Sequence, residues 1–336
     1  MDFRACPMIS GMYLNVNGRI DTGEKVISLC CENISNKPAI AFADTADETL
    51  ERFIGMRTIV MAESLRRQGG TRFGCTDCVN YRAGKWEINP FISYVNLSMY
   101  PAPCQCRCSY CGVAKTWRET PEVKAAYERM FDFVELAEES GVIDPTSAWQ
   151  ISSGEITIHP YKSRIMELIK GKRAIFYTNA FIFDECIARN LHDNSDSVIN
   201  LSIDAGTPET WHKVKGFNNF ETVTSNLVQY YKNSARPGQI TLKYIILPDI
   251  NDTYEDFKSV VEIMKLLEVK HLTISRDTNV KYQKNDAYHM KMIGAAAYLL
   301  AMCHKGGMTN DMFTYSQEEQ AETVRLAGEI LRENKI

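Results

Sequence analysis

The chain has 336 residues, of which 45% are hydrophobic, and a formal net charge of −4 with a pI of about 5.9. This length permits one large α/β domain, a small second domain and an ample core. The sequence has no run of Lys or Arg, which disfavours nucleic-acid binding through a basic face. No window of about eighteen apolar residues could span a membrane, and the N-terminus lacks the features of a signal peptide. We therefore expect a cytoplasmic protein that binds neither nucleic acid nor membranes.

The eleven cysteines form two groups along the chain. Five lie before residue 80 and four lie between residues 104 and 111, whereas Cys186 and Cys303 stand alone. In a cytoplasmic chain, so many cysteines indicate metal or redox chemistry rather than a disulfide framework. Their grouping predicts two metal or iron–sulfur sites.

Residues 1–88 contain a predicted hairpin and a predicted long helix. Alternating apolar residues in Met12–Val16 and Lys25–Leu29, around Asn17-Gly18, predict a β-hairpin with its turn at that Asn-Gly pair. Asp47–Arg67 has apolar residues at helical spacing and opens with acidic residues, as a helix N-terminus should. This segment therefore has secondary structure of its own around its cysteines.

Four of the N-terminal cysteines can enclose a metal completely, because a hairpin and a CxxC knuckle supply thiolates from several sides. The expected ligands are Cys6, Cys30 or Cys31, Cys75 and Cys78. A CxxC knuckle with two distant cysteines also suits tetrahedral zinc. Zinc is therefore an open alternative to an iron–sulfur cluster in this region.

The stretch Tyr100–Gly112 reads YPAPCQCRCSYCG and holds the second group. Cys104, Cys108 and Cys111 have the spacing CX3CX2C, with Tyr110 just before the last cysteine. A [4Fe–4S] cluster normally takes four protein ligands, so three thiolates would leave one iron open to a small molecule. A zinc loop or unrelated buried cysteines are the alternatives, although structural zinc usually takes two separate pairs of ligands.

This motif resembles the signature of the radical S-adenosylmethionine (SAM) superfamily. The resemblance implies that the open iron binds the amino and carboxylate groups of SAM, with Tyr110 among the cofactor contacts. It also implies that one electron, from a donor such as flavodoxin or ferredoxin, cleaves SAM to methionine and a 5′-deoxyadenosyl radical. That radical would abstract hydrogen from the substrate. Cys106 lies within the motif at a spacing that does not match the family, and it has no assigned role.

The N-terminal pattern C…NGR…CC…ETLERF…CxxC resembles the twitch and SPASM extensions of radical SAM enzymes. Those extensions usually follow the barrel, whereas here the pattern precedes it. The later cysteines of a full SPASM domain are missing, since no cysteine lies between Cys78 and Cys104. The resemblance thus implies one auxiliary [4Fe–4S] cluster in residues 1–88, held by the four ligands given above.

Residues 89–305 alternate short apolar strands with amphipathic helices, the pattern of parallel βα units. The expected strands are Tyr94–Met99, Trp149–Ser152, Ala174–Thr178, Val198–Asp204, Ile240–Leu247 and His271–Ser275. The expected helices are Pro121–Ser140, Tyr161–Lys170, Phe183–Asn190, Phe220–Lys232, Thr253–Leu267 and Ala287–Met302. Six such units match the partial (β/α)6 TIM barrel that the resemblance implies. A last helix, Gln317–Asn334, lies in a C-terminal extension, residues 306–336.

Barrel enzymes carry their chemistry at the C-terminal ends of the strands. The segment Ser152–Glu155 follows the second strand and resembles the Gly-Gly-Glu motif of the family, which hydrogen-bonds the amino group of SAM. The resemblance implies SAM contacts from Ser153, Gly154 and Glu155, and a simple strand-to-helix turn is the alternative. Asn179, where the third strand ends, is a further candidate for cofactor binding.

In the fourth strand, alternation places Asn200, Ser202 and Asp204 on one face. A parallel barrel strand is normally apolar, so polar residues facing the lumen need partners, and a polar ligand can provide them. The segment SIDAGTPETWHKVKG resembles a family segment whose serine and later basic residue contact the ribose and carboxylate of SAM. Ser202 and Lys215 match those two positions, although lysine lacks the bidentate fork of arginine.

Four residues are candidates for substrate chemistry. Lys243 interrupts the apolar fifth strand and would contact the substrate or a counter-ion, unless it points outward between helices. Arg276 and Asp277 end the sixth strand, where they could meet a polar substrate or pair with each other. Cys303 is a candidate hydrogen donor, with a buried helical cysteine as the alternative.

A fully ligated auxiliary cluster suits electron transfer, which favours dehydrogenation or epimerisation over methylation. No winged-helix module for a leader peptide precedes the barrel, which favours a sugar, a cyclitol or another small polar substrate. The alternatives are a radical SAM enzyme that modifies a ribosomal peptide, and a non-catalytic zinc or iron–sulfur protein that binds a partner.

Overall fold

The computed structural model describes residues 4–22, 26–30, 36–67, 70–78, 80–113, 117–152 and 154–333. The chain divides into two compact units, Met1–Pro103 with Lys115–Ile175, and Cys104–Ala114 with Phe176–Ile336. The short CX3CX2C segment therefore belongs to the second unit, although the residues on either side of it belong to the first.

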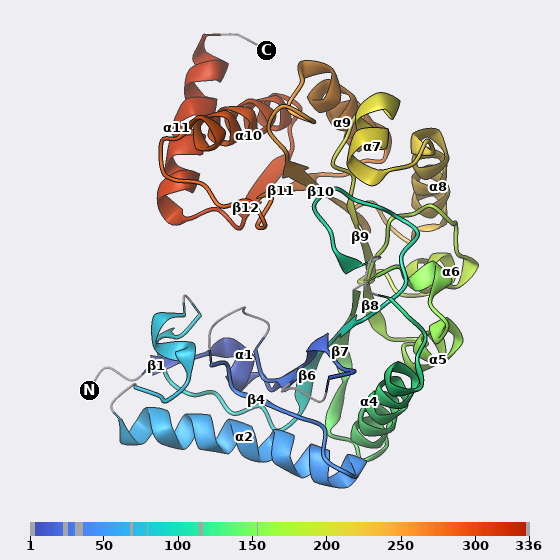
Figure 1. The fold of residues 1–336 in the computed structure, drawn as a ribbon, viewed down its shortest axis with the longest axis vertical. Helices are drawn as coiled ribbons and strands as arrows, with labels where there is room; N and C mark the ends of the chain where they lie inside the picture. The colour runs from blue at the N-terminus through green and yellow to red at the C-terminus, as the bar shows by residue number, and fades with distance from the viewer. Residues whose placement is uncertain are drawn as a thin grey trace. The chain divides into compact units, whose positions relative to one another are not determined.

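The first unit is built on a parallel sheet (Figure 1). β6 (Ile92–Tyr100) lies between β2 (Tyr13–Arg19) and β7 (Ile143–Ser152) and is parallel to both. β3 (Ile27–Ser28) and β4 (Ala39–Ile40) extend the sheet beyond β2 with antiparallel pairing. The N-terminal cysteine region thus contributes a strand beside the first strand expected for the barrel.

Two long helices pack against each other beside this sheet. They are α2 (Ala46–Arg66) and α4 (Pro121–Glu139). Thr45 and Thr120 cap them by accepting hydrogen bonds from Glu48 N and Val123 N, and such caps stabilise helix N-termini by about 1 kcal/mol. The two helices confirm the predictions over Asp47–Arg67 and Pro121–Ser140.

The remaining elements of the first unit are short. β1 (Arg4–Ala5) pairs antiparallel with β5 (Arg82–Ala83) in a separate sheet. The short helices are α1 (Pro7–Ser10), η1 (Gly74–Asp77), η2 (Ile156–Ile158) and α5 (Lys162–Leu168).

The predicted hairpin forms, but its turn is not at Asn17-Gly18. Asn15 and Val16 pair with Ser28 and Ile27, as a hairpin requires. Asn17 and Gly18 continue β2, and the chain turns only at residues 20–22. The reason is tertiary, because all seven residues of β2 pair with β6 and these hydrogen bonds outweigh the local turn preference of Asn-Gly.

The second unit contains a parallel sheet in the order β9 (Val198–Ser202), β10 (Ile240–Ile246), β11 (His271–Arg276) and β12 (Thr309–Phe313). β8 (Arg173–Tyr177) crosses the boundary between the units. The helices are α6 (Glu185–Asp193), α7 (Pro208–Lys215), α8 (Phe220–Asn233), α9 (Tyr254–Leu266), α10 (Ala287–Lys305) and α11 (Gln317–Arg332).

The alternation of strands and helices confirms the expected α/β fold with a largely parallel sheet. Each predicted strand and helix of residues 89–305 is present, with ends that differ by a few residues. In the second unit, β12 and α7 were not predicted from the sequence. β12 reads TNDMF, with three polar residues in a row and no buried residue, so it lacks the apolar run that marks the other strands. No described helix is long and apolar enough to cross a membrane.

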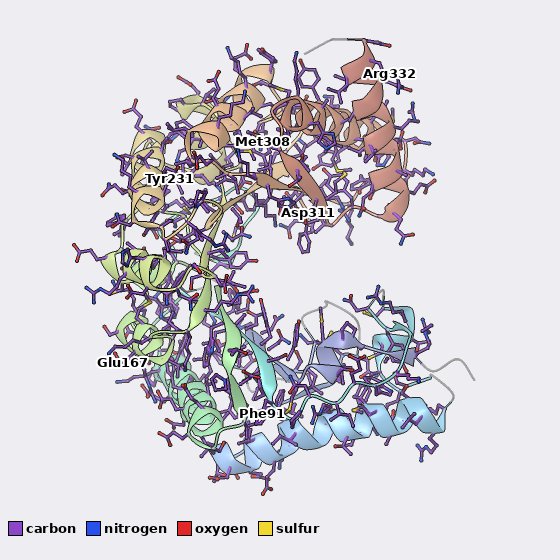
Figure 2. All side chains as sticks on the ribbon, turned by 180° about the vertical axis from the view of Figure 1, so that it is seen from behind. Phe91, Glu167, Tyr231, Met308, Asp311 and Arg332 are labelled. Atoms are coloured by element: carbon purple, nitrogen blue, oxygen red, sulfur yellow. The ribbon has the colours of Figure 1, made fainter. Side chains whose placement is uncertain are left out.

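The sheet of the second unit has one apolar and one polar face. Register places Leu201, Leu242 and Leu272 in one buried row, on the face that α10 packs against. The next row, which faces the other way, contains Ser202, Lys243, Thr273 and Asp311, and we call it the polar row. Figure 2 shows Asp311 on the side of the sheet away from α10 and α11.

Asp256, at the start of α9, fixes the turn between β9 and α7. Its buried carboxylate accepts hydrogen bonds from Gly206 N (2.8 Å) and Thr207 N (3.1 Å) and from the hydroxyls of Thr210 and Thr253. A Cβ on Gly206 would lie 2.1 Å from the Asp256 carbonyl oxygen, so only glycine allows this approach. The orientation of α7 therefore depends on one carboxylate.

We predict that Asp256→Ala lowers the free energy of unfolding by roughly 3 kcal/mol, because it leaves buried N–H groups without an acceptor. Urea denaturation of both proteins measures the difference. Glu255→Ala is the matched control, since Glu255 is the exposed neighbour in the same helical turn and its loss should cost about 0.5 kcal/mol or less. Equal stability of the Asp256 variant and the control would contradict this assignment.

Candidate functional site

The cluster loop, residues 104–113, is held by the C-terminal end of α7. Arg107 N donates to Lys215 O and Ser109 N donates to Val214 O, both at 3.0 Å. Gly216 ends α7 with a positive φ of 80°, and a Cβ there would lie 3.0 Å from Cβ of Arg107. A glycine at the end of α7 thus lets the loop approach the helix closely.

The thiols of the cluster loop interact with one another. Hydrogen bonds to Cys104 and Cys108 raise the pKa of Cys106, so this thiol keeps its proton and acts as the donor. The bond from Cys106 lowers the pKa of Cys108 to about 6, with a smaller contribution from the ammonium of Lys215 and against the effect of burial. Cys108 is therefore disposed to be a thiolate at neutral pH, which is the form that binds metals.

The remaining expected ligand, Cys111, is partly buried, and burial raises the pKa of its thiol. The negative charges of Cys108 and Cys104 raise the pKa of Cys111 further. Three mutually interacting thiols on one loop are a donor set that fits three irons of a [4Fe–4S] cluster. The structure brings Cys106 into the same group, which spacing alone did not suggest.

A buried network lies beside these thiols. The ammonium of Lys215 donates to Asp204 Oδ2 (2.5 Å), Ser202 O (2.7 Å) and Tyr110 Oη (2.9 Å). The Tyr110 hydroxyl in turn donates to Asp204. Lys215 is 3% exposed and Asp204 is fully buried. Burial opposes the charge on Lys215, but the attraction of Asp204 and Cys108 outweighs it, so the pKa of Lys215 is raised.

Asp204 does not continue β9, as alternation had suggested. It lies two residues beyond the end of the strand, with a positive φ of 48°. Its Oδ1 accepts a hydrogen bond from Ile245 N (2.7 Å), and its carbonyl oxygen accepts one from the Asn251 side chain (2.9 Å). The carboxylate thus connects the end of β9 with β10 and with Lys215.

In the first unit, the turn after β7 lies against the chain just before the cluster loop. Gly154 has a φ of 66°, and a Cβ there would lie 2.4 Å from Pro103 O. Glu155 N donates to the same oxygen at 2.7 Å, while its buried carboxylate accepts from Thr157 N and the Thr157 hydroxyl. Ser153, the third expected residue of this edge, lies outside the described residues.

Asn179 meets the cluster loop directly. Its Nδ2 lies 3.8 Å from Cys104 Sγ, and its Oδ1 accepts hydrogen bonds from Gln105 and from Phe181 N. The residue expected at the end of the third strand therefore contacts a candidate cluster ligand.

Lys243 is half-buried in the polar row. Its Nζ lies 4.9 Å from the centre of the Phe313 ring, within cation–π distance. Burial lowers the pKa of Lys243, and the charges of Asp204 and Asp311 partly offset this effect. The side chain thus lies on the face away from α10, together with the acidic Asp311.

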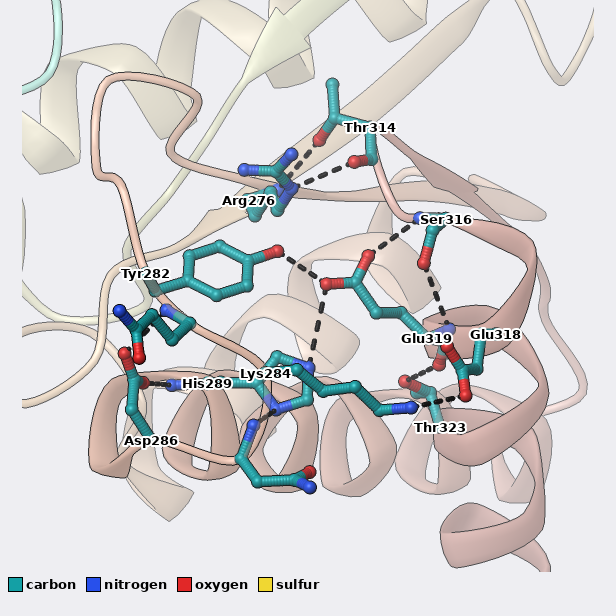
Figure 3. Close-up of polar contacts among 12 residues, drawn as sticks. Arg276, Tyr282, Lys284, Asp286, His289, Thr314, Ser316, Glu318, Glu319 and Thr323 are labelled. Atoms are coloured by element: carbon teal, nitrogen blue, oxygen red, sulfur yellow. Dashed lines mark hydrogen bonds and ion pairs between the residues drawn. The ribbon is translucent and has the colours of Figure 1, made fainter.

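Arg276 contacts Thr314 and Tyr282, near α10 and α11, and no described residue of the polar row (Figure 3). Its Nε donates to Thr314 O at 2.9 Å, and its guanidinium lies 5.2 Å from the centre of the Tyr282 ring. The Tyr282 hydroxyl donates to Glu319 on α11, and Glu319 lies 3.6 Å from His289 on α10. This network connects the end of β11 with α10 and α11.

Cys303 lies on α10 and is fully buried. Burial raises the pKa of its thiol to about 11, against a hydrogen bond from Asn310. Asn310 shares a row with Leu272, on the face that α10 covers. The Cys303 thiol is therefore on the opposite face of the sheet from the polar row.

The N-terminal cysteines partly assemble. β1 and β5 pair so that Ala5 is opposite Arg82, which brings Cys6 towards the 75–78 knuckle. Burial raises the pKa of Cys75 to about 11, and the nearby thiols of Cys6 and Cys78 add to this shift. Cys30 follows β3, where its carbonyl oxygen accepts a hydrogen bond from Ser28, and Cys31 lies outside the described residues.

Among the described residues, no three Cys, His, Asp or Glu side chains converge as ligands of one metal ion. A [4Fe–4S] cluster binds each thiolate to a different iron, so its ligands surround a larger body than a single ion.

Residues 103–264 match the sequence model of the radical SAM superfamily. These residues form a radical SAM domain. The match begins one residue before Cys104, includes the Gly154–Glu155 turn and the Lys215 network, and ends within α9.

Two known proteins show the extent of the similarity. The chain is 25% identical to a probable GTP 3′,8-cyclase of Methanocaldococcus jannaschii over 180 residues, which are 50% of this chain and 57% of that protein. It resembles SuiB of Streptococcus suis bound to S-adenosylmethionine with a TM-score of 0.52 and 12% identity, over 84% of this chain and 59% of SuiB. The chain thus spans somewhat more than half the length of each protein, and SuiB shows the fold alone.

We predict that replacing Cys104, Cys108 and Cys111 together by alanine removes one cluster, about four irons per chain, because these three thiolates are its expected ligands. Iron and sulfide analysis after anaerobic reconstitution measures the loss. Cys106→Ala should keep the iron content of the wild type. Full SAM cleavage by the triple variant would refute the ligand assignment.

Proposed function

We propose that the protein is a radical SAM enzyme that abstracts hydrogen from a small polar substrate. The observation that carries the proposal is the three-thiol loop within the matched radical SAM domain. When bound, the cluster and SAM supply a 5′-deoxyadenosyl radical. Cys104, Cys108 and Cys111 hold the cluster, and the edge formed by Gly154 and Glu155 binds the amino group of SAM.

Second, we propose an auxiliary [4Fe–4S] cluster held by Cys6, Cys75 and Cys78, with Cys30 or Cys31 as the fourth ligand. The mutual influence of the first three thiols supports this grouping. A cluster with four protein ligands has no iron open to substrate, so its role is to accept or pass an electron. Zinc is the competing occupant.

Two buried amide oxygens in the first unit favour a substrate that is rich in hydrogen-bond donors. Register places Asn15, Asn96 and Gln150 in one row, opposite to the buried row of Leu14, Val95 and Trp149. The side-chain oxygens of Asn15 and Asn96 are buried and accept no hydrogen bond from the described residues. An unpaired buried carbonyl costs about 1–3 kcal/mol, and the hydroxyl groups of a sugar or cyclitol would satisfy it.

In the second unit, Lys243 belongs to the polar row, on the face of the sheet away from α10. We propose that Lys243 contacts an acceptor group of the substrate. Arg276 is engaged by Thr314 and Tyr282, so its part in substrate binding would be indirect.

Dehydrogenation and epimerisation are the two alternative reactions. An epimerase needs a hydrogen donor, and a thiol is suitable because its S–H bond is weak. Cys303 lies across the sheet from the polar row, which favours dehydrogenation with the auxiliary cluster as the second electron acceptor. Modification of a ribosomal peptide is the competing activity.

We predict that the Cys104/Cys108/Cys111 triple alanine variant, reconstituted anaerobically, keeps about four irons and four sulfides, because Cys6, Cys75 and Cys78 are unchanged. Iron, sulfide and zinc analysis with absorption spectroscopy measures this. A variant without iron and sulfide, or with one zinc per chain, would exclude the auxiliary cluster.

Turnover in deuterated water separates the two reaction outcomes. We predict an oxidised product without solvent deuterium, formed equally by the wild type and Cys303→Ala, because the buried thiol is on the wrong face to reach the substrate. Mass spectrometry of the product measures the deuterium. Deuterium in the wild-type product that disappears in the variant would show an epimerase with Cys303 as donor.

A further inference from the structure

Lys215 is a buried charged side chain beside the cluster loop. An ammonium has three N–H donors, and those of Lys215 are all directed at protein acceptors in Asp204, Ser202 and Tyr110. A buried charge is tolerated only when it is paired and fully hydrogen-bonded, and this lysine meets both conditions. It therefore has no donor left for the carboxylate of SAM, the role implied by its position in the sequence.

The contacts of Lys215 hold three segments together. Its side chain reaches the end of β9 through Ser202 and Asp204, and the cluster loop through Tyr110. Its carbonyl oxygen accepts the backbone N–H of Arg107 in the same loop. Both ends of this one residue thus fix the loop on which the thiols lie.

The ammonium also has an electrostatic effect on the loop. The ammonium lies 2.9 Å from the hydroxyl of Tyr110, which stands in the loop between Cys108 and Cys111, and Lys215 is only 3% exposed, so solvent and salt screen its charge little. Reduction of an iron–sulfur cluster adds one negative charge, and a nearby buried cation stabilises that charge.

We propose that Lys215 is a positioning residue for the SAM-binding cluster, which fixes the loop through Tyr110 and Asp204 and favours the reduced state of the cluster. This inference rests on the proposed function. Lys215 then contacts only protein groups next to the cluster loop, and other residues bind SAM.

The test uses Lys215→Met in the full chain, reconstituted anaerobically. Methionine keeps much of the length of the side chain and removes the charge. We expect the midpoint potential of the SAM-responsive cluster, followed by electron paramagnetic resonance, to shift to more negative values. We expect the affinity for SAM to change less than about threefold. Lys213→Met is the matched control, because Lys213 is exposed on the same helix, and it should change neither quantity.

An unchanged potential together with a tenfold or greater loss of SAM affinity would overturn the inference, since that result means that Lys215 binds SAM. Tyr110→Phe tests whether the hydrogen bonds of Tyr110 fix the cluster loop, and it changes no charge. We expect it to release iron to EDTA several-fold faster than the wild type, and an equal rate would refute the positioning role.

Lys215→Met leaves Asp204 buried and unpaired, which can prevent folding. The double variant Lys215→Met with Asp204→Asn removes both charges and restores the balance. We expect the double variant to fold. Its midpoint potential should lie between those of the wild type and Lys215→Met. If Lys215→Met does not fold, the midpoint potential of the double variant should lie below that of the wild type. A potential at or above that of the wild type would refute the electrostatic part. A wild type without a SAM-responsive iron–sulfur signal would instead refute the proposed function.

Discussion

The backbone hydrogen bonds from Arg107 and Ser109 to the last residues of α7 fix the loop on which the cysteines lie. A loop of this length has few stabilising contacts of its own, and the conformational entropy of each unrestrained residue opposes one fixed geometry. The anchor must itself be rigid. Asp256 supplies that rigidity, because it binds the turn from which α7 begins, and Gly206 permits the close approach.

The fold could be predicted from the sequence, and the candidate cluster ligands were proposed from it, for different reasons. The strands of the parallel sheets alternate or run apolar in the sequence, and these patterns are local, so they could be found without a structure. The three candidate ligands of the SAM-binding cluster were proposed from their spacing. The turn at Asn17-Gly18 was predicted wrongly because β6, about eighty residues away, pairs with the whole of β2. Local turn preference cannot report such a distant partner.

The surroundings of the cluster could not be predicted in the same way. Alternation along β9 placed Asp204 with Ser202, but the chain leaves the strand after Ser202 and Asp204 adopts a positive φ. Nothing in the sequence shows that the ammonium of Lys215 ends on that carboxylate, since the pairing depends on where α7 lies. The part taken by Cys106 likewise depends on the folded loop, which brings its thiol to Cys104 and Cys108.

Under the proposed function, the N-terminal region would have two connected roles, in cluster binding and in substrate binding. Cys6 precedes β2 by only the short segment that contains α1, and β2 is paired with β6 along its whole length. A cluster held by Cys6, Cys75 and Cys78 would therefore restrain the start of a strand that also carries Asn15, a member of the polar face of this unit. Binding of metal to cysteines and folding of the segment between them are coupled, because the ligands are rarely preformed in the unfolded chain. Loss of the auxiliary cluster would then loosen the row of Asn15, Asn96 and Gln150 as well as remove an electron acceptor.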